Sequence, residues 1–292
     1  MPIARGIPLG LGIGWGGMKI LRVFPRRTKA TPTDSMVYID RPPDMFVPEC
    51  DEIHISVTFT YDMARAEQLY EQWGAVGVPV QMGGPAFGKP SGEFIPGRYL
   101  REGYTITSRG CPNKCWFCSV WKREPKHIEL EIKDGWIVQD DNLLACSDRH
   151  IKAVFEMLKR QPQKAVLSGG LESKNLKEWH VAGLKEVEPK RMYFAYDTKD
   201  DYEPLVEAGK LLKRYDFKIR QCRCYVLIGY KGDTFEKADK RLKQTVKAGF
   251  WPFAMLYKDE QGNEDKAWRK FQRIWCNPYI VGSQIRGLYE QI

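Results

Sequence analysis

Three cysteines stand close together near the middle of the chain, where Ser108–Val120 reads SRGCPNKCWFCSV. Cys111, Cys115 and Cys118 are separated by gaps of three residues and then two. Thiolates are soft ligands for zinc and for iron–sulfur clusters, and a [4Fe–4S] cluster usually takes four of them. Three neighbouring thiolates would hold three irons and leave the fourth open to a small chelating ligand, much as catalytic metal sites keep one position open.

A zinc site is the alternative for these cysteines, with His127 or Cys146 as the borrowed fourth ligand. The gaps of three and two are unlike paired zinc knuckles, and the chain contains only 4 histidines. Three unligated core cysteines are disfavoured, because Pro112, Asn113 and Lys114 make the loop between them polar.

Composition sets the broad class of the protein. The 292 residues suffice for one large α/β domain or for a medium domain with a smaller partner. The chain has no apolar run of about 18 residues, so we expect no membrane-spanning helix. Its 8 cysteines, without a convincing export signal, indicate reduced thiols and a cytoplasmic location. A net charge of +9 fits either an anionic partner such as RNA or a solvated basic surface.

The elements that position the cysteines begin after a glycine-rich stretch, residues 1–18, which we interpret as a flexible extension. Residues 19–97 combine β-branched runs with one helical pattern of apolar residues, which predicts a small Rossmann-like βαβ region with parallel strands. These strands and this helix are expected at Leu21–Phe24, Glu52–Phe59, Asp62–Ala75 and Pro79–Pro85. A linker rich in glycine and proline, residues 86–99, follows.

Residues 98–292 continue the alternation of strands and helices with longer helices. We predict an α/β fold in which about six βα units form a partial (βα)6 barrel, fewer than the eight of a full barrel. In such folds the chemistry gathers at the carboxyl ends of the strands. The strands are expected at Tyr104–Gly110, Lys164–Gly170, Arg191–Asp197, Lys218–Tyr230, Phe250–Tyr257 and, as a short last strand, Pro278–Ser283; the helices at Ser147–Gln161, Tyr202–Phe217, Asp233–Phe250 and Glu264–Cys276.

The pattern Cys111-x-x-x-Cys115-x-x-Cys118 directly follows a predicted strand, and the aromatic Phe117 precedes its last cysteine. This combination resembles the signature of the radical S-adenosylmethionine (radical SAM) enzymes, over about Tyr99–Ile292. The resemblance implies a partial radical SAM barrel and a [4Fe–4S] cluster on the three cysteines. It also implies that S-adenosylmethionine chelates the open iron and is cleaved by one electron from an external donor of flavodoxin or ferredoxin type. The 5′-deoxyadenosyl radical then abstracts hydrogen from a substrate in a site that excludes water.

The sequence LSGGLES resembles the family's glycine-rich GGE motif, whose backbone contacts the amino group of S-adenosylmethionine. Two glycines permit a close backbone approach to a ligand, although a purely conformational turn is the alternative. Leu171 interrupts the motif, so we assign no contact to Glu172. The residues assigned to cofactor binding are Ser168, Gly169 and Gly170.

Later strand ends offer further candidate cofactor residues. Asp197 could accept hydrogen bonds from ribose hydroxyls, or cap a helix. Alternation along the strand at 218–230 places Cys222 and Cys224 on the face beneath outer helices, and Arg223 on the opposite face. Arg223 is therefore a candidate for the carboxylate of S-adenosylmethionine or for a substrate anion. The stretch IGYKGD, with Gly229, resembles the family's loop near the adenine.

Two other regions resemble radical SAM enzymes that carry a cobalamin-binding domain. One is DDNLLACSDRH, in which Asp141 and Asn142 could orient cofactor or substrate, or form a polar turn. The other is the region 19–97. It lacks the axial-ligand motif Asp-x-His-x-x-Gly, and its only histidine, His54, lies inside a predicted strand, so the sequence argues against cobalamin.

The sequence thus predicts a radical SAM enzyme acting on a small molecule or a peptide. The alternatives are a radical SAM enzyme that modifies RNA, suggested by the basic charge, and a non-enzymatic zinc protein. The identity of the substrate depends on the residues at the strand ends, and their chemistry is mixed: Arg223, Tyr225, Tyr257 and Lys258.

Overall fold

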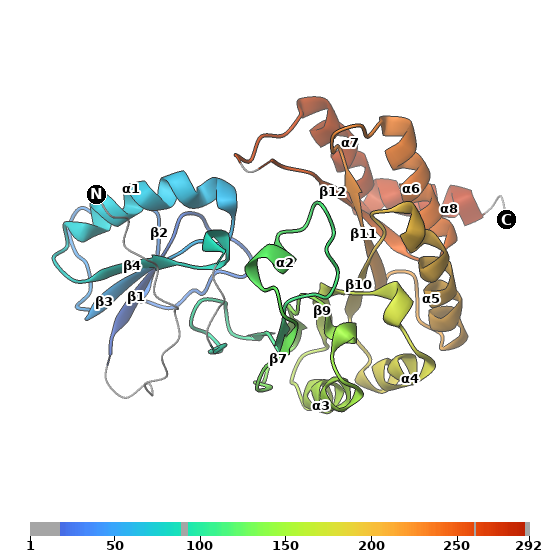
Figure 1. Cartoon of the computed structure of the whole chain (residues 1–292), viewed down its shortest axis with the longest axis horizontal. Helices are drawn as coiled ribbons and strands as arrows, with labels where there is room; N and C mark the ends of the chain where they lie inside the picture. Colours follow the sequence, from blue (N-terminus) through green and yellow to red (C-terminus); the bar gives the residue numbers. More distant parts are fainter. Residues whose placement is uncertain (1–17, 89–92, 260, 290–292) are drawn as a thin grey trace.

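The computed structural model describes residues 18–88, 93–259 and 261–289, so the expected flexible extension lies outside the described residues except for Met18. The chain forms two parallel β-sheets, which lie on either side of a central segment containing the short helix α2 (Val120–Arg123) (Figure 1). This arrangement confirms the predicted α/β class. No described helix has the length and apolar character needed to cross a membrane.

The first sheet has four parallel strands in the order β2-β1-β3-β4. The helix α1 (Met63–Gly74) covers it with Ala66, Leu69 and Trp73, buried at helical spacing. The predicted strand, helix and strand are therefore confirmed, whereas β2 is a strand of three residues that the sequence did not predict. The strands are β1 (Ile20–Phe24), β2 (Val37–Ile39), β3 (Glu52–Ser56) and β4 (Val80–Gly83).

The second sheet has six parallel strands in the order β12-β11-β10-β9-β8-β5. The strands are therefore neighbours in the sheet in the same order as in the chain. A two-stranded antiparallel ladder of β6 (Ser108–Arg109) and β7 (Ile128–Glu129) flanks the cysteine loop. The six strands are β5 (Tyr104–Thr105), β8 (Ile137–Val138), β9 (Val166–Leu171), β10 (Arg191–Ala195), β11 (Cys222–Ile228) and β12 (Trp251–Leu256).

Helices cover one face of this sheet (Figure 1). Side chains of Ser147, Thr234 and Asp265 accept backbone N–H hydrogen bonds and begin three of them, as their residue types favour. The helices are α3 (Asp148–Lys159), α4 (Glu178–Val187), α5 (Tyr202–Arg214), α6 (Phe235–Lys247), α7 (Lys266–Cys276) and α8 (Pro278–Tyr289). Short 3-10 segments are η1 (Thr60–Asp62), η2 (Pro85–Phe87), η3 (Leu143–Ala145), η4 (Ser173–Asn175) and η5 (Lys199–Asp201).

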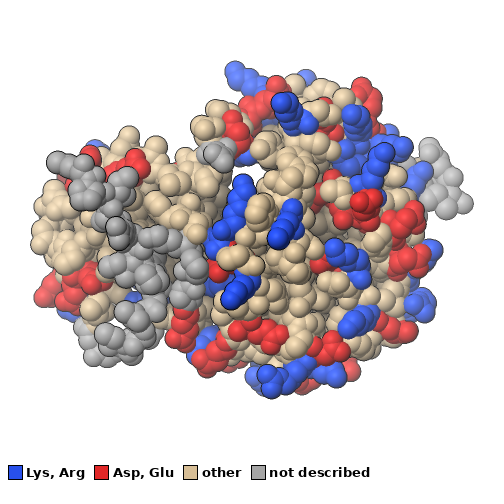
Figure 2. Space-filling view, in the orientation of Figure 1, with Lys and Arg blue, Asp and Glu red and all other residues tan. Residues whose placement is uncertain are grey.

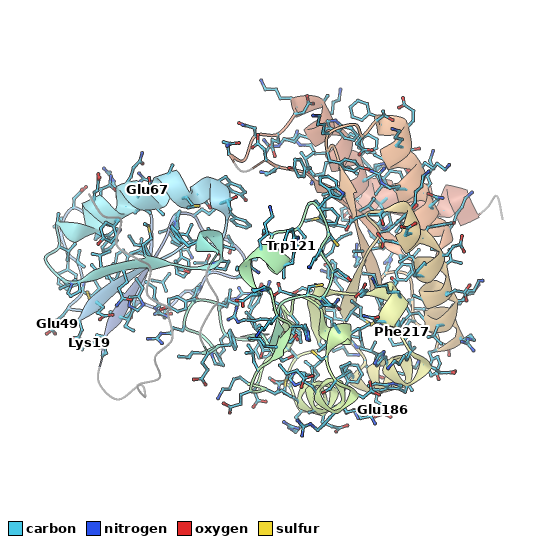
Figure 3. The ribbon with its side chains drawn as sticks, viewed as in Figure 1. Lys19, Glu49, Glu67, Trp121, Glu186 and Phe217 are labelled. Carbon is cyan, nitrogen blue, oxygen red and sulfur yellow. The ribbon has the colours of Figure 1, made fainter. Side chains whose placement is uncertain are left out.

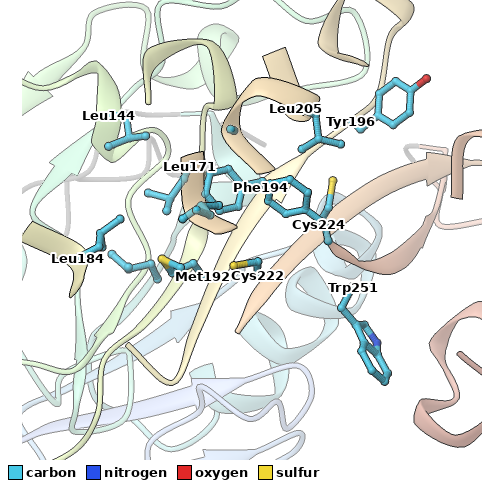
Figure 4. Close-up of a cluster of buried hydrophobic side chains, with 14 of the residues drawn as sticks. Leu144, Leu171, Leu184, Met192, Phe194, Tyr196, Leu205, Cys222, Cys224 and Trp251 are labelled. Carbon is cyan, nitrogen blue, oxygen red and sulfur yellow. The ribbon is translucent and has the colours of Figure 1, made fainter. Parts of the chain in front are cut away.

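Alternate residues of the strands pack beneath these helices (Figure 4). In β11 the residues Cys222, Cys224, Val226 and Ile228 are buried and the residues between them are partly exposed. The prediction that Cys222 and Cys224 belong to the core is therefore confirmed. Burial raises the pKa of the Cys222 thiol to about 12, as expected for an inert core thiol.

Within the described ranges, no helix covers the opposite face of the sheet (Figure 1). Three rings on adjacent strands cross its middle: Tyr193 stacks on Tyr225 at 4.8 Å between ring centroids, and Tyr225 meets Phe253 edge-on at 5.7 Å. We call these three residues the aromatic row. Between this row and the carboxyl ends of the strands, Gly169 and Ala195 are exposed. The uncovered face is therefore open on the side nearer the carboxyl ends.

Some sequence predictions were wrong. Pro278–Ser283 was expected as a strand but begins α8, because Val281 and Ile285 are buried one helical turn apart. The predicted strand Tyr104–Gly110 is divided between β5 and β6. β9 continues through its two glycines to Leu171, with an irregular register against β10, instead of ending in a turn.

The end of the predicted linker and the residues just after it pack against the first sheet. The buried Arg22 donates to the carbonyl oxygens of Gly97 at 3.2 Å and Arg98 at 2.9 Å. The backbone N–H of Arg101 donates to the Ala30 carbonyl at 2.7 Å. These contacts join the first sheet to the strand β5 that follows.

Candidate metal centre

The cysteine loop lies across the carboxyl ends of the six-stranded sheet. The Asn113 side chain donates to Glu172, just after β9, at 2.7 Å. The Trp116 ring lies 5.3 Å from Tyr230, after β11, and 6.2 Å from Tyr257, after β12. The edge predicted from the sequence to carry the chemistry is therefore where this loop packs.

The three thiols of the loop are partly exposed and free of disulfides. Burial raises the pKa of Cys115, and the neighbouring Cys118 and Cys111 raise it further, so the three sulfurs are within electrostatic range of one another. Among the described residues, no three His, Cys, Asp or Glu side chains are arranged to hold a metal ion. The donor set itself, three soft thiols on one loop, fits an iron–sulfur cluster and does not fit a hard cation.

Internal contacts shape the loop around the thiols. The Trp121 indole, near the centre of the molecule in Figure 3, donates to the Cys115 carbonyl at 3.0 Å. The backbone N–H of Val120 donates to the Cys118 sulfur at 3.5 Å. A hydrogen bond of this kind favours a thiolate and is common around sulfur ligands.

Asn142 links the loop to the next strand. Its amide nitrogen donates to the Cys111 sulfur at 3.5 Å and to the Glu172 carboxylate at 2.7 Å. Its amide oxygen is buried and has no hydrogen-bond partner among the described residues. The sequence suggested that Asn142 could orient cofactor or substrate, and the structure brings it into contact with one of the three cysteines.

Glu172 is the residue of this site that the sequence did not identify. Besides Asn113 and Asn142, it accepts a hydrogen bond from Asn175 at 3.0 Å and pairs with Lys174 at 2.6 Å. Burial acts to raise its pKa, but the hydrogen bonds from Lys174, Asn113 and Asn142 outweigh it and hold the pKa below its ordinary value. Glu172 therefore remains ionised and joins the cysteine loop to the ends of β8 and β9. The GGE-like motif pointed to this position, but the intervening Leu171 argued against it.

The two aspartates before Asn142 hold the start of the loop. Asp140 is buried and accepts hydrogen bonds from the Thr107 backbone and hydroxyl, both at 2.6 Å, and from the Ser108 hydroxyl at 2.9 Å. Burial raises the pKa of Asp140, against the lowering effect of these bonds. Asp141 accepts from the Gly110 N–H at 2.8 Å and pairs with Arg123 at 3.4 Å. Both carboxylates therefore position the loop.

The three residues of the glycine-rich motif differ in their surroundings. The Ser168 hydroxyl donates to the Val138 carbonyl at 3.1 Å and ties β9 to β8. A Cβ at Gly169 would lie 1.9 Å from the Asp140 carbonyl oxygen, so this glycine allows close packing of two backbones. Gly170 has φ +111° and open space where a side chain would stand. Gly170 is thus free of the close backbone packing that holds Gly169 against Asp140.

Asp197 and Gly229 lie at the same edge of the sheet. Asp197 accepts the backbone N–H of Leu227 at 2.8 Å, and burial raises its pKa to about 6. Gly229, at φ +75°, donates its N–H to Asp233 at 2.9 Å in the turn after β11. Both residues therefore shape the edge of the sheet through contacts within the protein.

Arg223 does not join the other predicted cofactor residues. It faces the uncovered side of the sheet, as expected, but it is the second residue of β11 and lies opposite Tyr193 and Trp251 near the amino ends of the strands. The aromatic row separates it from the cysteine loop. Alternation along a strand predicts which face a residue occupies, but not which end of the sheet it reaches.

Two aromatic residues, Trp116 and Phe117, lie between the second and third cysteines of the loop. Phe117 meets Trp116 edge-on at 5.4 Å between ring centroids. Trp116 is 58% exposed and contacts rings that follow β11 and β12. The adjacent aromatics in Cys-Trp-Phe-Cys were the sequence signal for this cluster, but only the fold shows that Trp116 reaches the far strands.

The remaining candidate ligands are engaged elsewhere. His127 and Cys146, proposed as a fourth zinc ligand, contact each other at 3.7 Å, and burial raises the pKa of Cys146 to about 12. In the first sheet, His54 bonds through one ring nitrogen to Tyr99 at 2.6 Å and through the other to Glu52 at 2.8 Å. Both nitrogens of His54 therefore have partners within the protein.

Comparisons with known proteins do not identify a family for this chain. A scan against protein-family models finds no match, and a search of curated proteins finds none either.

Proposed function

We propose that the chain is a radical SAM enzyme whose [4Fe–4S] cluster is held by Cys111, Cys115 and Cys118. The observation that carries this proposal is the position of the three-thiol loop across the carboxyl ends of six parallel strands, beside the exposed glycine backbone of β9. Bound there, a cluster with one open iron would supply the electron that cleaves S-adenosylmethionine to the 5′-deoxyadenosyl radical.

Each residue of the edge has a role in this proposal. Asn142 orients the Cys111 sulfur by its hydrogen bond, and Glu172 holds Asn142 and Asn113 in place. The open backbone of Gly170 receives the amino group of the cofactor. Trp116 and Phe117 cover the loop with apolar surface, which keeps water from the reacting atoms.

The finer architecture that we propose is the partial (βα)6 barrel of this family. It is supported by the sequential order of the six strands and by helices on one face only. The uncovered face would then be the inner wall, and the gap visible between the two parts of the molecule in Figure 2 would admit the substrate. We propose a small molecule or a peptide as that substrate, and a flavodoxin- or ferredoxin-type protein as the electron donor.

Anaerobic reconstitution with iron and sulfide tests the proposal. We expect about four irons per chain and brown absorbance, with 5′-deoxyadenosine released from S-adenosylmethionine under a reductant. Cys115→Ala should lose cluster and cleavage while keeping the fold. The matched control is Cys276→Ala, because Cys276 is also a free, partly exposed thiol but lies on α7. Unchanged iron content in Cys115→Ala would refute the assignment.

The alternatives give different outcomes in the same samples. A colourless protein with one bound zinc would support the non-enzymatic zinc protein. RNA as the substrate requires binding that weakens steeply with salt, because it depends on release of counterions from phosphates. Lysines and arginines are interspersed with acidic residues over the face shown in Figure 2.

A further inference from the structure

Three arginines gather at the amino ends of β10 and β11, opposite the end that carries the cysteine loop. Arg191 begins β10, Arg223 is the second residue of β11, and Arg220 lies just before that strand. Arg223 faces Tyr193 across the two strands, and Arg191 lies two residues before Tyr193 on the same face. The three residues therefore lie near one another at the amino ends of these strands, a region that we call the corner.

This cluster lacks a counter-charge. Within the described part of the chain, none of Arg191, Arg220 and Arg223 has a side-chain hydrogen bond or an ion pair with a carboxylate, and the Nε of Arg223 is buried without a partner. Burial lowers the pKa of Arg223, and the charge of Arg191 lowers it further, followed by that of Arg220. Three cations held together without an acid repel one another, and an anion bound between them would relieve that repulsion.

The corner also has a defined shape. The Trp251 ring lies beneath two of the guanidinium groups, with its centroid 4.8 Å from Arg223 and 6.0 Å from Arg220. Trp251 is itself buried at the margin of the cluster under the helices, where Figure 4 labels it. A guanidinium held over an aromatic ring keeps its plane fixed, so its N–H fork is already oriented for a planar or tetrahedral oxyanion.

We propose that Arg191, Arg220 and Arg223 form a binding site for the phosphate groups of a small phosphorylated ligand, separate from the thiol centre. Phosphate fits best because several guanidinium forks converge, and each can donate two hydrogen bonds to phosphate oxygens. A single carboxylate would leave most of these donors unused. The aromatic row lies between this corner and the cysteine loop, so the site does not share ligands with the one that binds the cluster.

The proposal is tested by measuring the binding of pyrophosphate to the full chain at low salt, with phosphorus NMR or calorimetry. Wild-type protein should bind, and Arg191→Gln and Arg223→Gln should each weaken binding by about tenfold, because each removes a charge-assisted pair of hydrogen bonds. Arg223→Lys, which keeps the charge but not the fork, should bind with intermediate affinity. The matched control is Arg149→Gln on α3, an exposed arginine far from this corner, which should bind as wild type.

Three results would overturn the proposal. They are a wild type that binds no pyrophosphate, an Arg149→Gln variant that loses as much affinity for pyrophosphate as the variants of the cluster, and an Arg223→Gln variant that binds it as tightly as the wild type. Binding of a short RNA, but not of pyrophosphate, that depends on Arg223 would also overturn the small-ligand assignment. Thermal melts without ligand check the fold of each variant, and Arg191→Gln should melt no lower than wild type, because it relieves repulsion. Because the measurement needs no cluster, Cys115→Ala should bind pyrophosphate normally, which separates this test from that of the proposed function.

Discussion

Asp197 is a residue whose burial is expected to reduce stability at neutral pH. Its carboxylate is buried at the edge of the sheet and accepts one backbone hydrogen bond from Leu227 at 2.8 Å. That bond lowers its pKa, but burial outweighs it and the nearby Asp201 adds to the increase, so the pKa rises from 3.8 to about 6. A carboxylate kept in such a place is available to hydrogen-bond a ligand's hydroxyl groups.

The sign of the resulting pH dependence follows from linkage. Because the folded state binds this proton more tightly than the unfolded state, the unfolding free energy should fall as pH rises from about 4 to about 6 and stay lower above that. Asp197→Asn should therefore gain about 1–2 kcal/mol at pH 7.5, allowing for partial exposure, and little at pH 4. Urea denaturation at both pH values measures this. Asp200→Asn, an exposed neighbour, is the control, and an equal gain at both pH values would contradict the assignment.

At the scale of elements, β9 and the segment before η3 are held at contact distance by one glycine. A Cβ at Gly169 would lie 1.9 Å from the Asp140 carbonyl oxygen and 2.7 Å from its nitrogen. Both are backbone atoms, so neither can move aside without shifting the Asp140 contacts to Thr107 and Ser108. The close approach of β9 to Asp140 therefore connects the paired strands β8 and β9 to the start of the cysteine loop.

Gly169→Ala should destabilise the fold by about 2–3 kcal/mol, since an added methyl group is forced into packed backbone. Gly287→Ala on α8 is the matched control: nothing lies within 4 Å of its added Cβ, and a helical alanine should cost nothing or gain up to about 1 kcal/mol. Chemical denaturation of both variants measures these changes in the free energy of unfolding. A Gly169→Ala variant as stable as the wild type would mean that β9 is free to move away from Asp140.

Elements with a clear local pattern could be predicted from the sequence. The alternation of β11 and the capped, amphipathic α3 are set by which face is buried, and that is visible in one stretch of chain. α4 was missed because Gly183, which packs its bare backbone on Phe155, interrupts the helical pattern. β8, with two residues, is too short to show a period; neighbouring strands decide its place.

The candidate site was predictable in part, because some of its residues form a pattern within one short stretch of chain. The three cysteines are neighbours in the chain, so their spacing alone indicated their chemistry. Glu172 reaches residues up to 59 positions away, and only the order of the strands brings Asn113 and Asn142 to it. Arg223 was assigned to the correct face but to the wrong end of the sheet, because a side-chain period of two carries no information on register.

At the scale of the whole molecule, one buried cation joins the two parallel sheets. Arg22 is 6% exposed, pairs with Asp34, and donates to two carbonyl oxygens of the segment that leads to β5. Removing it would leave the part-buried carbonyl oxygens of Gly97 and Arg98 without this donor, whereas the half-exposed Asp34 carboxylate would stay solvated.

Arg22→Met should therefore lower the unfolding free energy by about 1–3 kcal/mol. It should also speed hydrogen exchange at the Arg101 amide, which bonds to Ala30, while amides of β10 keep their protection. Arg65→Met, which removes a half-exposed pair with Asp40, is the control and should change stability by less than about 1 kcal/mol. Equal protection of Arg101 in both variants would show that other contacts hold the sheets together.

The three rings of the aromatic row, on β10, β11 and β12, lie across the uncovered face of the sheet and divide it into two ends. A molecule that docks at one end has to arrive and depart through that end, so occupants of the two ends do not displace one another. Whatever influence one occupant has on the other must pass along the strands themselves, as small shifts of backbone or ring. In the two-site arrangement that we propose, the two ligands would therefore bind in either order.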